Sequence, residues 1–94
     1  MAKAVKQGDL VKSISGRDAG KTFLVVSVKE KFAFVVDGKT RKTVKPKKKN
    51  VKHLEKFSNV SIIELAEKIK NGIPVGNDRV YRAVKTEQQK LQED

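Results

Sequence analysis

Turn signals follow one another at close spacing in the first forty residues, which leaves room only for short elements between them. Glycine and aspartate mark turns at residues 8–9, 15–20 and 37–38. The apolar-rich runs between these turns are short: 10–14, 22–28 and 32–36. Such runs are rich in β-branched and aromatic residues, which favour strands over helices. The spacing therefore predicts several short antiparallel strands joined by tight turns.

Alternation within these runs predicts which side chains share a face of the sheet. One set is Leu24, Val26 and Val28, and a second is Phe32, Phe34 and Val36.

Asp37 and Gly38 form a strong hairpin signal, because glycine accepts the positive φ that a type I′ turn requires. We therefore expect a returning strand at 40–44. Pro46 lacks an N–H group to donate to a strand, so it should end that strand or leave it at an edge. An exposed loop at 47–50 and a last short strand at 51–54 would follow.

Four or five short strands within residues 5–56 predict a mainly-β fold. A small barrel is the expected form, because closure removes the unpaired edges of a sheet.

The second half of the sequence changes to a helical period. Ser61 and Glu64 match a capping box, and Gly72 should close the helix that follows. A second helix should begin at Asn77 and Asp78 and run to about Gln89. The apolar positions of the two helices are Ile62, Leu65, Ala66, Ile69, Val80, Tyr81 and Val84. We expect residues 60–91 to form a helical appendage that packs on the barrel or, alternatively, binds a partner.

Positive charge is concentrated in one segment. The chain has 22 Lys and Arg against 11 Asp and Glu, a net charge of +11. Residues 39–56 carry nine bases and one acid, whereas the other 76 residues carry 13 bases and 10 acids. A local basic stripe is typical of proteins that bind polyanions. The alternatives are a solvated surface that aids solubility and a polybasic membrane patch. A polybasic membrane patch is usually accompanied by a lipidation motif or a basic amphipathic helix, and neither accompanies this segment, so the membrane alternative is the weaker one.

Several classes of protein are excluded by what the sequence lacks. Cysteine is absent, and His53 is the only histidine. We therefore expect no disulfide, no metal site and no cofactor. No paired carboxylates and no nucleophile–base set stand out, so we expect no enzymatic activity and no small-molecule substrate. The longest apolar run is too short to span a membrane, and no apolar stretch follows the N-terminus. We expect a cytoplasmic protein.

Residues 16–22 superficially match the phosphate-binding loop of nucleotide hydrolases. Only three residues separate Gly16 from Gly20-Lys21-Thr22, whereas that loop needs four, and a strand rather than a helix follows. The match therefore does not indicate nucleotide hydrolysis.

The same region fits a different motif. Its glycines, acids, bases and flanking apolar residues are Gly8, Asp9, Val11, Ile14, Ser15, Gly16, Arg17, Asp18, Gly20, Lys21, Val25 and Val26. This pattern resembles the KOW motif, a strand–loop–strand unit of SH3-like barrels in ribosomal proteins and some transcription factors. The resemblance implies that the loop backbone approaches a phosphate between two basic side chains, with a serine hydroxyl nearby. The alternative is an ordinary hairpin turn with two incidental bases.

The resemblance extends over residues 5–56. Residues 32–36, the basic stretch after them and the segment 50–55 are similar to the eukaryotic- and archaeal-type large-subunit ribosomal protein of the fourteen-e family. Compact bacterial KOW proteins are also similar. The resemblance implies a ribosomal or ribosome-associated protein that contacts ribosomal RNA through the KOW loop and the basic segment. The predicted RNA-binding residues are Ser15, Gly16, Arg17, Gly20, Lys21, Lys39, Arg41, Lys42, Lys45, Lys47, Lys48, Lys49 and Lys52.

Two other functions remain open. One is a protein-interaction KOW module of a transcription or translation complex, and the other is non-specific DNA binding. A lone histidine such as His53 is more often packed or hydrogen-bonded than catalytic. Tyr81 and the four phenylalanines fit core positions, so no exposed aromatic platform for bases is expected.

Overall fold

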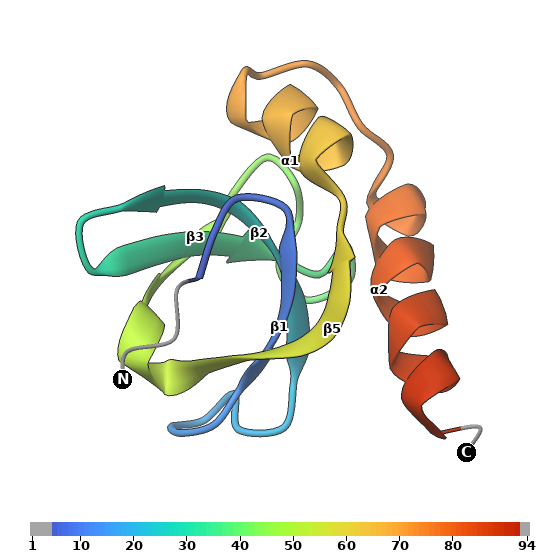
Figure 1. Ribbon diagram of the computed structural model, residues 1–94. Coiled ribbons are helices and arrows are strands. Elements are labelled where there is room, and N and C mark those ends of the chain that lie inside the picture. The colour runs from blue at the N-terminus through green and yellow to red at the C-terminus, as the bar shows by residue number, and fades with distance from the viewer. Residues whose placement is uncertain (1–4, 93–94) are drawn as a thin grey trace.

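The computed structural model describes residues 5–92, which fold into a five-stranded antiparallel sheet and two helices (Figure 1). The strands run in the order β4-β3-β2-β1-β5, so β4 and β5 are the two edges of an open sheet. The predicted class, mainly β with two following helices, is confirmed. The elements are β1 (Asp9–Ser13), β2 (Thr22–Lys29), β3 (Phe32–Val36), β4 (Lys47–Asn50), the short 3₁₀ turn η1 (Val51–His53), β5 (Leu54–Ser61), α1 (Ile63–Lys70) and α2 (Asn77–Gln92).

The sheet buries apolar side chains on both of its faces. One cluster joins Phe23 of β2 to Val11, Val25, Ala33, Val35 and Leu54. The other joins Leu24 of β2 to Leu10, Val26, Val36, Leu65, Ile69, Val80 and Val84. The last four of these residues belong to α1 and α2, so the helices pack on the sheet and complete its second core.

Two differences from the predicted faces occur in β2 and β3, and a bulge in β2 accounts for the first. The register between β2 and β3 shifts between Val25 and Ser27. Beyond this shift, Val28 is exposed, although alternation placed it with Leu24 and Val26. In β3, the buried side chains include Ala33 and Val35, whereas Phe32 and Phe34 are only partly buried. The prediction that those two phenylalanines face the core is therefore wrong.

The predicted returning strand at 40–44 is also wrong, because this segment is a loop. The Asp37 carboxylate accepts hydrogen bonds from the N–H groups of Lys39 and Arg41, at 2.8 and 2.7 Å. It also accepts one from the hydroxyl of Thr40, so the chain closes on itself as a local turn. Further along, the N–H of Thr43 donates to α2 instead of to β3.

On the side away from β2, β3 pairs with β4, which contains the three consecutive lysines expected in an exposed loop. Lys47 lies opposite Val35, and Lys49 lies opposite Ala33. Lysine has a weak intrinsic preference for strands, but its charge suits an edge strand because it discourages pairing with other chains. Tertiary pairing has thus overridden local preference at this edge.

The predicted strand at 51–54 is replaced by η1 and the start of β5. The side chain of Asn50 accepts a hydrogen bond from the N–H of Lys52 and caps the 3₁₀ turn. From Leu54, β5 continues to Ser61 and pairs with β1, so the predicted boundary at residue 56 falls inside this strand.

The helix ends agree only in part with their sequence signals. Ser61 does not cap α1, because its hydroxyl donates to Asp9 of β1 at 3.1 Å. At the other end, Gly72 has φ +76°, and the N–H of Ile73 donates to the carbonyl of Lys68. The prediction that Gly72 closes this helix is therefore confirmed. Asn77, the predicted cap of α2, instead accepts the N–H of Thr43 with its side chain.

Candidate nucleic-acid interface

The loop between β1 and β2 holds the KOW-like residues in a compact turn. The N–H of Gly20 donates to the carbonyl of Ser13 at 2.8 Å, and the N–H of Ser13 donates to the carbonyl of Lys21 at 2.9 Å. Gly16 and Gly20 have φ values of +80° and +91°. A Cβ atom placed on either glycine would meet no atom within 4 Å. Their backbone is therefore left-handed and open on its outer side, as close approach to a phosphate requires.

Two contacts fasten this loop to η1. The Ser15 hydroxyl oxygen and the His53 Nδ1 atom lie 2.6 Å apart and share a hydrogen bond. The N–H of Ile14 donates to the carbonyl of His53 at 2.9 Å. His53 is thus hydrogen-bonded, as predicted, and it fixes the start of the loop.

Asp18, at the centre of the loop, gathers lysines from the loop itself and from the distant strand β4. It forms an ion pair with Lys47, and its Oδ2 atom lies 3.4 Å from Nζ of Lys49. Its other carboxylate oxygen lies 3.8 Å from Nζ of Lys21. The hydrogen bond from Lys47 lowers the pKa of Asp18, and the charges of Lys47 and Lys49 add to that effect, although burial opposes it. One acid therefore draws three bases together and leaves an excess of positive charge.

The side chains of β4 do not all belong to this group. Because successive strand residues point to opposite faces, Lys47 and Lys49 reach Asp18 while Lys48 points the other way. The Nζ atom of Lys48 lies 4.3 Å from the centre of the Phe32 ring, within range of a cation–π contact.

The remaining predicted bases are spread over three places. Arg17 lies in the β1–β2 loop, and Lys52 lies in η1. The loop between β3 and β4 holds Lys39, Arg41, Lys42 and Lys45, of which Lys45 borders an apolar groove. The predicted residues therefore do not form one continuous stripe. Those that the structure brings together are Lys21, Lys47 and Lys49 at Asp18, and Lys21 and Lys39 at a pocket beside α2.

That pocket has a volume of about 270 Å³ and lies between the β1–β2 loop, the β3–β4 loop and α2. Tyr81 lines it, with the Nζ atoms of Lys39 and Lys85 each 5.6 Å from the ring centre. Tyr81 is half-buried, so the prediction that it is a core residue is wrong. Sequence reasoning also missed Lys85. The four-residue spacing from Tyr81 to Lys85, which places both on one side of a helix, is the signal that could have found it.

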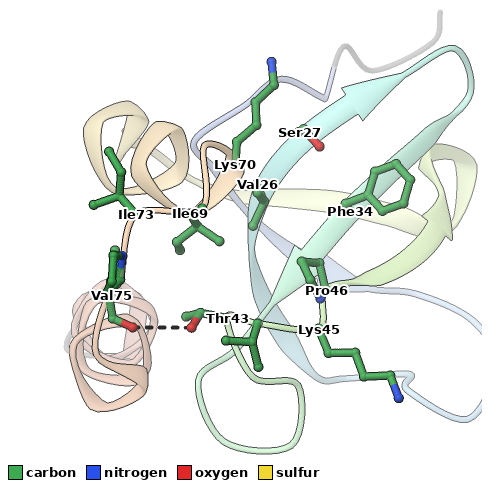
Figure 2. A pocket seen from close by; sticks show the side chains of 13 residues that line it. Val26, Ser27, Phe34, Thr43, Lys45, Pro46, Ile69, Lys70, Ile73 and Val75 are labelled. Atoms are coloured by element: carbon green, nitrogen blue, oxygen red, sulfur yellow. Dashed lines mark hydrogen bonds between the residues drawn. The ribbon is translucent and has the colours of Figure 1, made fainter.

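A larger groove lies between the sheet and the end of α1 (Figure 2). Its volume is about 800 Å³, and its lining is mostly apolar, with Val26 and Phe34 from the sheet facing Ile69 and Ile73. A hydrogen bond of 3.3 Å from the Thr43 hydroxyl to the Val75 carbonyl joins its two sides.

Within residues 5–92, no group of three or more acidic or histidine side chains is placed to hold a metal ion. Neither α1 nor α2 combines the length and hydrophobicity needed to cross a bilayer. A comparison of the sequence with models of known protein families and with curated proteins finds no match.

Proposed function

We propose that this chain is an RNA-binding protein that contacts phosphates through the β1–β2 loop and the lysines of β4. The observation that carries the proposal is the cluster around Asp18. It brings Lys21 of the loop and two lysines of β4 to one carboxylate, in the same loop as the open backbone of Gly16 and Gly20. Lysine and arginine meet phosphates without reading bases, so recognition would follow the shape and backbone of the RNA.

The fold that we propose for this function is an SH3-like KOW barrel. The strand order supports it, because β5 returns to pair with β1 and η1 joins the two edge strands directly. The KOW-like loop then projects from one end of the curved sheet (Figure 1). The resemblance to ribosomal KOW proteins makes ribosomal RNA the expected ligand, in a cytoplasmic ribonucleoprotein that serves translation.

The test compares the affinity of charge variants for a structured RNA hairpin. Arg17→Gln with Lys21→Gln removes two exposed charges from the loop and should weaken binding about tenfold or more, since each lost phosphate contact contributes. A matched control, Lys29→Gln with Lys68→Gln, removes the same charge elsewhere and should have a much smaller effect. Equal loss in both variants would mean that only net charge matters and would contradict a defined site.

Two further measurements test the identity of the nucleic acid. Competition between structured RNA and duplex DNA at fixed salt should favour RNA, and equal competition would indicate non-specific DNA binding. Crosslinking in cells followed by sequencing should recover ribosomal RNA. Recovery of unrelated transcripts in proportion to their abundance would contradict a ribosomal function.

The apolar groove in Figure 2 favours a second candidate function, a protein-interaction module. Val44 borders this groove and is 90% exposed, which is unusual for valine. A partner that stays bound after nuclease treatment, and that Val44→Asp releases, would support this function. A partner that nuclease removes would support RNA binding.

A further inference from the structure

We propose that the pocket beside α2 binds a phosphodiester of the RNA backbone, which would make α2 part of the binding surface. This inference rests on the proposed function and extends it to a helix that the KOW resemblance does not cover. The motif ends before α2 begins, so nothing in the motif requires basic residues on that helix.

Lysines from three separate elements line the pocket. Lys21 comes from the β1–β2 loop, Lys39 from the β3–β4 loop and Lys85 from α2. Like charges repel, so lysines that line one pocket in the absence of a ligand raise the energy of the folded chain. A pocket lined in this way is typical of a site whose anion is supplied from outside, because the anion removes the repulsion.

Tyr81 organises two of these lysines. The Nζ atoms of Lys39 and Lys85 both lie 5.6 Å from the centre of its ring, where the electron-rich face attracts cations. The ring thus holds two charges in place without neutralising either one. A carboxylate in the same position would have cancelled part of the charge that a phosphate needs.

The other polar groups that line the pocket leave its positive charge in excess. Asp37 is the one acid that lines it, and hydrogen bonds from Thr40 and from the N–H groups of Lys39 and Arg41 occupy its carboxylate. Gln88 accepts a hydrogen bond from the Thr22 hydroxyl at 3.1 Å and lies 3.4 Å from Nζ of Lys85. Three bases against one acid leave the pocket positive.

The position of the pocket connects it to the proposed interface. Lys21 belongs both to this pocket and to the cluster at Asp18, so the two sites share a side chain. In Figure 1, α2 runs along the sheet toward the end at which the β1–β2 loop lies. One RNA strand that passes the loop would therefore meet both sites.

The chain itself supplies the probe for a test, because Tyr81 is its only tyrosine. Protein labelled with fluorotyrosine gives one ¹⁹F resonance, which reports on this pocket alone. We expect the resonance to shift on addition of a short RNA hairpin, with the same midpoint as binding measured by fluorescence anisotropy of the labelled RNA. An unmoved resonance at saturating RNA would overturn the inference while leaving the proposed function intact.

Charge variants provide the second arm. Lys39→Gln with Lys85→Gln should lower the slope of log K against log salt by about one, as expected for one lost phosphate. The control, Arg79→Gln with Arg82→Gln, removes the same charge from α2 outside the pocket lining and should leave the slope nearly unchanged. Equal slopes for the two variants would contradict the inference.

Two outcomes separate the sources of phosphate and the two proposals. If inorganic phosphate or pyrophosphate shifts the resonance at concentrations as low as those of RNA, the pocket is a small-anion site and the assignment to the RNA backbone is wrong. If the wild-type protein fails to bind RNA at low salt, the proposed function fails together with this inference.

Discussion

Asp18 is the residue on which the arrangement of the candidate interface depends most. Its carboxylate is largely buried, and it binds Lys47 and Lys49, which are also partly buried. This single acid fixes the β1–β2 loop to the edge strand β4. The lysines that would meet phosphate are therefore held in place before any RNA binds, which lowers the entropic cost of binding.

Replacement of this carboxylate tests its structural role. Asp18→Asn should lower the free energy of unfolding at pH 7 by about 1–2 kcal/mol, because charge-assisted hydrogen bonds are lost. The folded-state pKa of Asp18 lies below its unfolded value. The stabilisation is therefore present above about pH 4 and is lost as the pH falls through the folded pKa. Urea unfolding at pH 7 and well below pH 4 measures both expectations.

Asp78→Asn is the matched control for that experiment. Asp78 forms an exposed pair with Arg82 on α2, and such pairs contribute about 0–1 kcal/mol. If Asp18→Asn were no more destabilising than this control at pH 7, Asp18 would not organise the loop.

The residues of the candidate site differ in how far the sequence could predict them. Arg17 and Lys21 belong to a local loop motif, whose spacing is visible in the sequence. The partnership of Asp18 with Lys47 joins residues far apart in the chain, so no local pattern reveals it. Tyr81 and Lys85 gain their role only because the β3–β4 loop lies against α2.

At the scale of the elements, the β3–β4 loop shows why a strong local signal failed. Asp37 and Gly38 are a typical hairpin pair, and φ of Gly38 is indeed positive, at +78°. The chain does not return as a strand because the Asp37 carboxylate binds the following residues and Thr43 bonds to Asn77. The turn was predictable from the sequence, whereas the contact with α2 that redirects the chain was not.

Gly38 and Gly72 provide a matched pair of variants for this contact. Their φ values are nearly equal, at +78° and +76°. A Cβ atom on Gly38 would lie 2.1 Å from the carbonyl oxygen of Asn77, whereas one on Gly72 would meet nothing within 4 Å. Gly72→Ala should cost about 1–2 kcal/mol of stability from backbone strain alone. Gly38→Ala should cost at least about 1 kcal/mol more, because the loop must move away from α2.

Thermal or urea unfolding of the two alanine variants measures whether Gly38→Ala loses more stability than Gly72→Ala. Equal losses of stability would mean that the loop does not pack closely against the start of α2. The pocket beside Tyr81 depends on the same contact, so Gly38→Ala should also alter the environment of Tyr81, and Gly72→Ala should not.

At the scale of the whole molecule, the helices complete the core. The face of the sheet that carries Leu10 and Leu24 is covered by four apolar side chains of α1 and α2: Leu65, Ile69, Val80 and Val84. Burial of each contributes about 2 kcal/mol. Their sum is comparable with the whole free energy of unfolding of a small domain, about 5–15 kcal/mol. The helical periodicity predicted these apolar positions correctly, but it could not decide between packing on the sheet and binding a partner.

Leu65 and Ile63 allow this account to be tested within one helix. Leu65 is 3% exposed and contacts the sheet core, whereas Ile63 is 57% exposed. Leu65→Ala should lower stability by about 2–4 kcal/mol, and Ile63→Ala should change it by less than about 1 kcal/mol.

A chain that ends at Ser61 should fail to fold, as measured by circular dichroism. A folded, monomeric product would show that the helices are a dispensable appendage.

The central claim is that the sheet presents a preformed cationic site to RNA phosphates, and its salt dependence tests that claim most directly. The measurement is the affinity of the wild-type protein for a structured RNA hairpin over a series of salt concentrations. We expect log K to fall linearly with log salt, with a slope of about 0.7–0.9 for each phosphate contacted and at least about 3 in all. Arg17→Gln with Lys21→Gln should reduce that slope by about one to two. An affinity that does not change with salt, or no binding even at low salt, would contradict the claim.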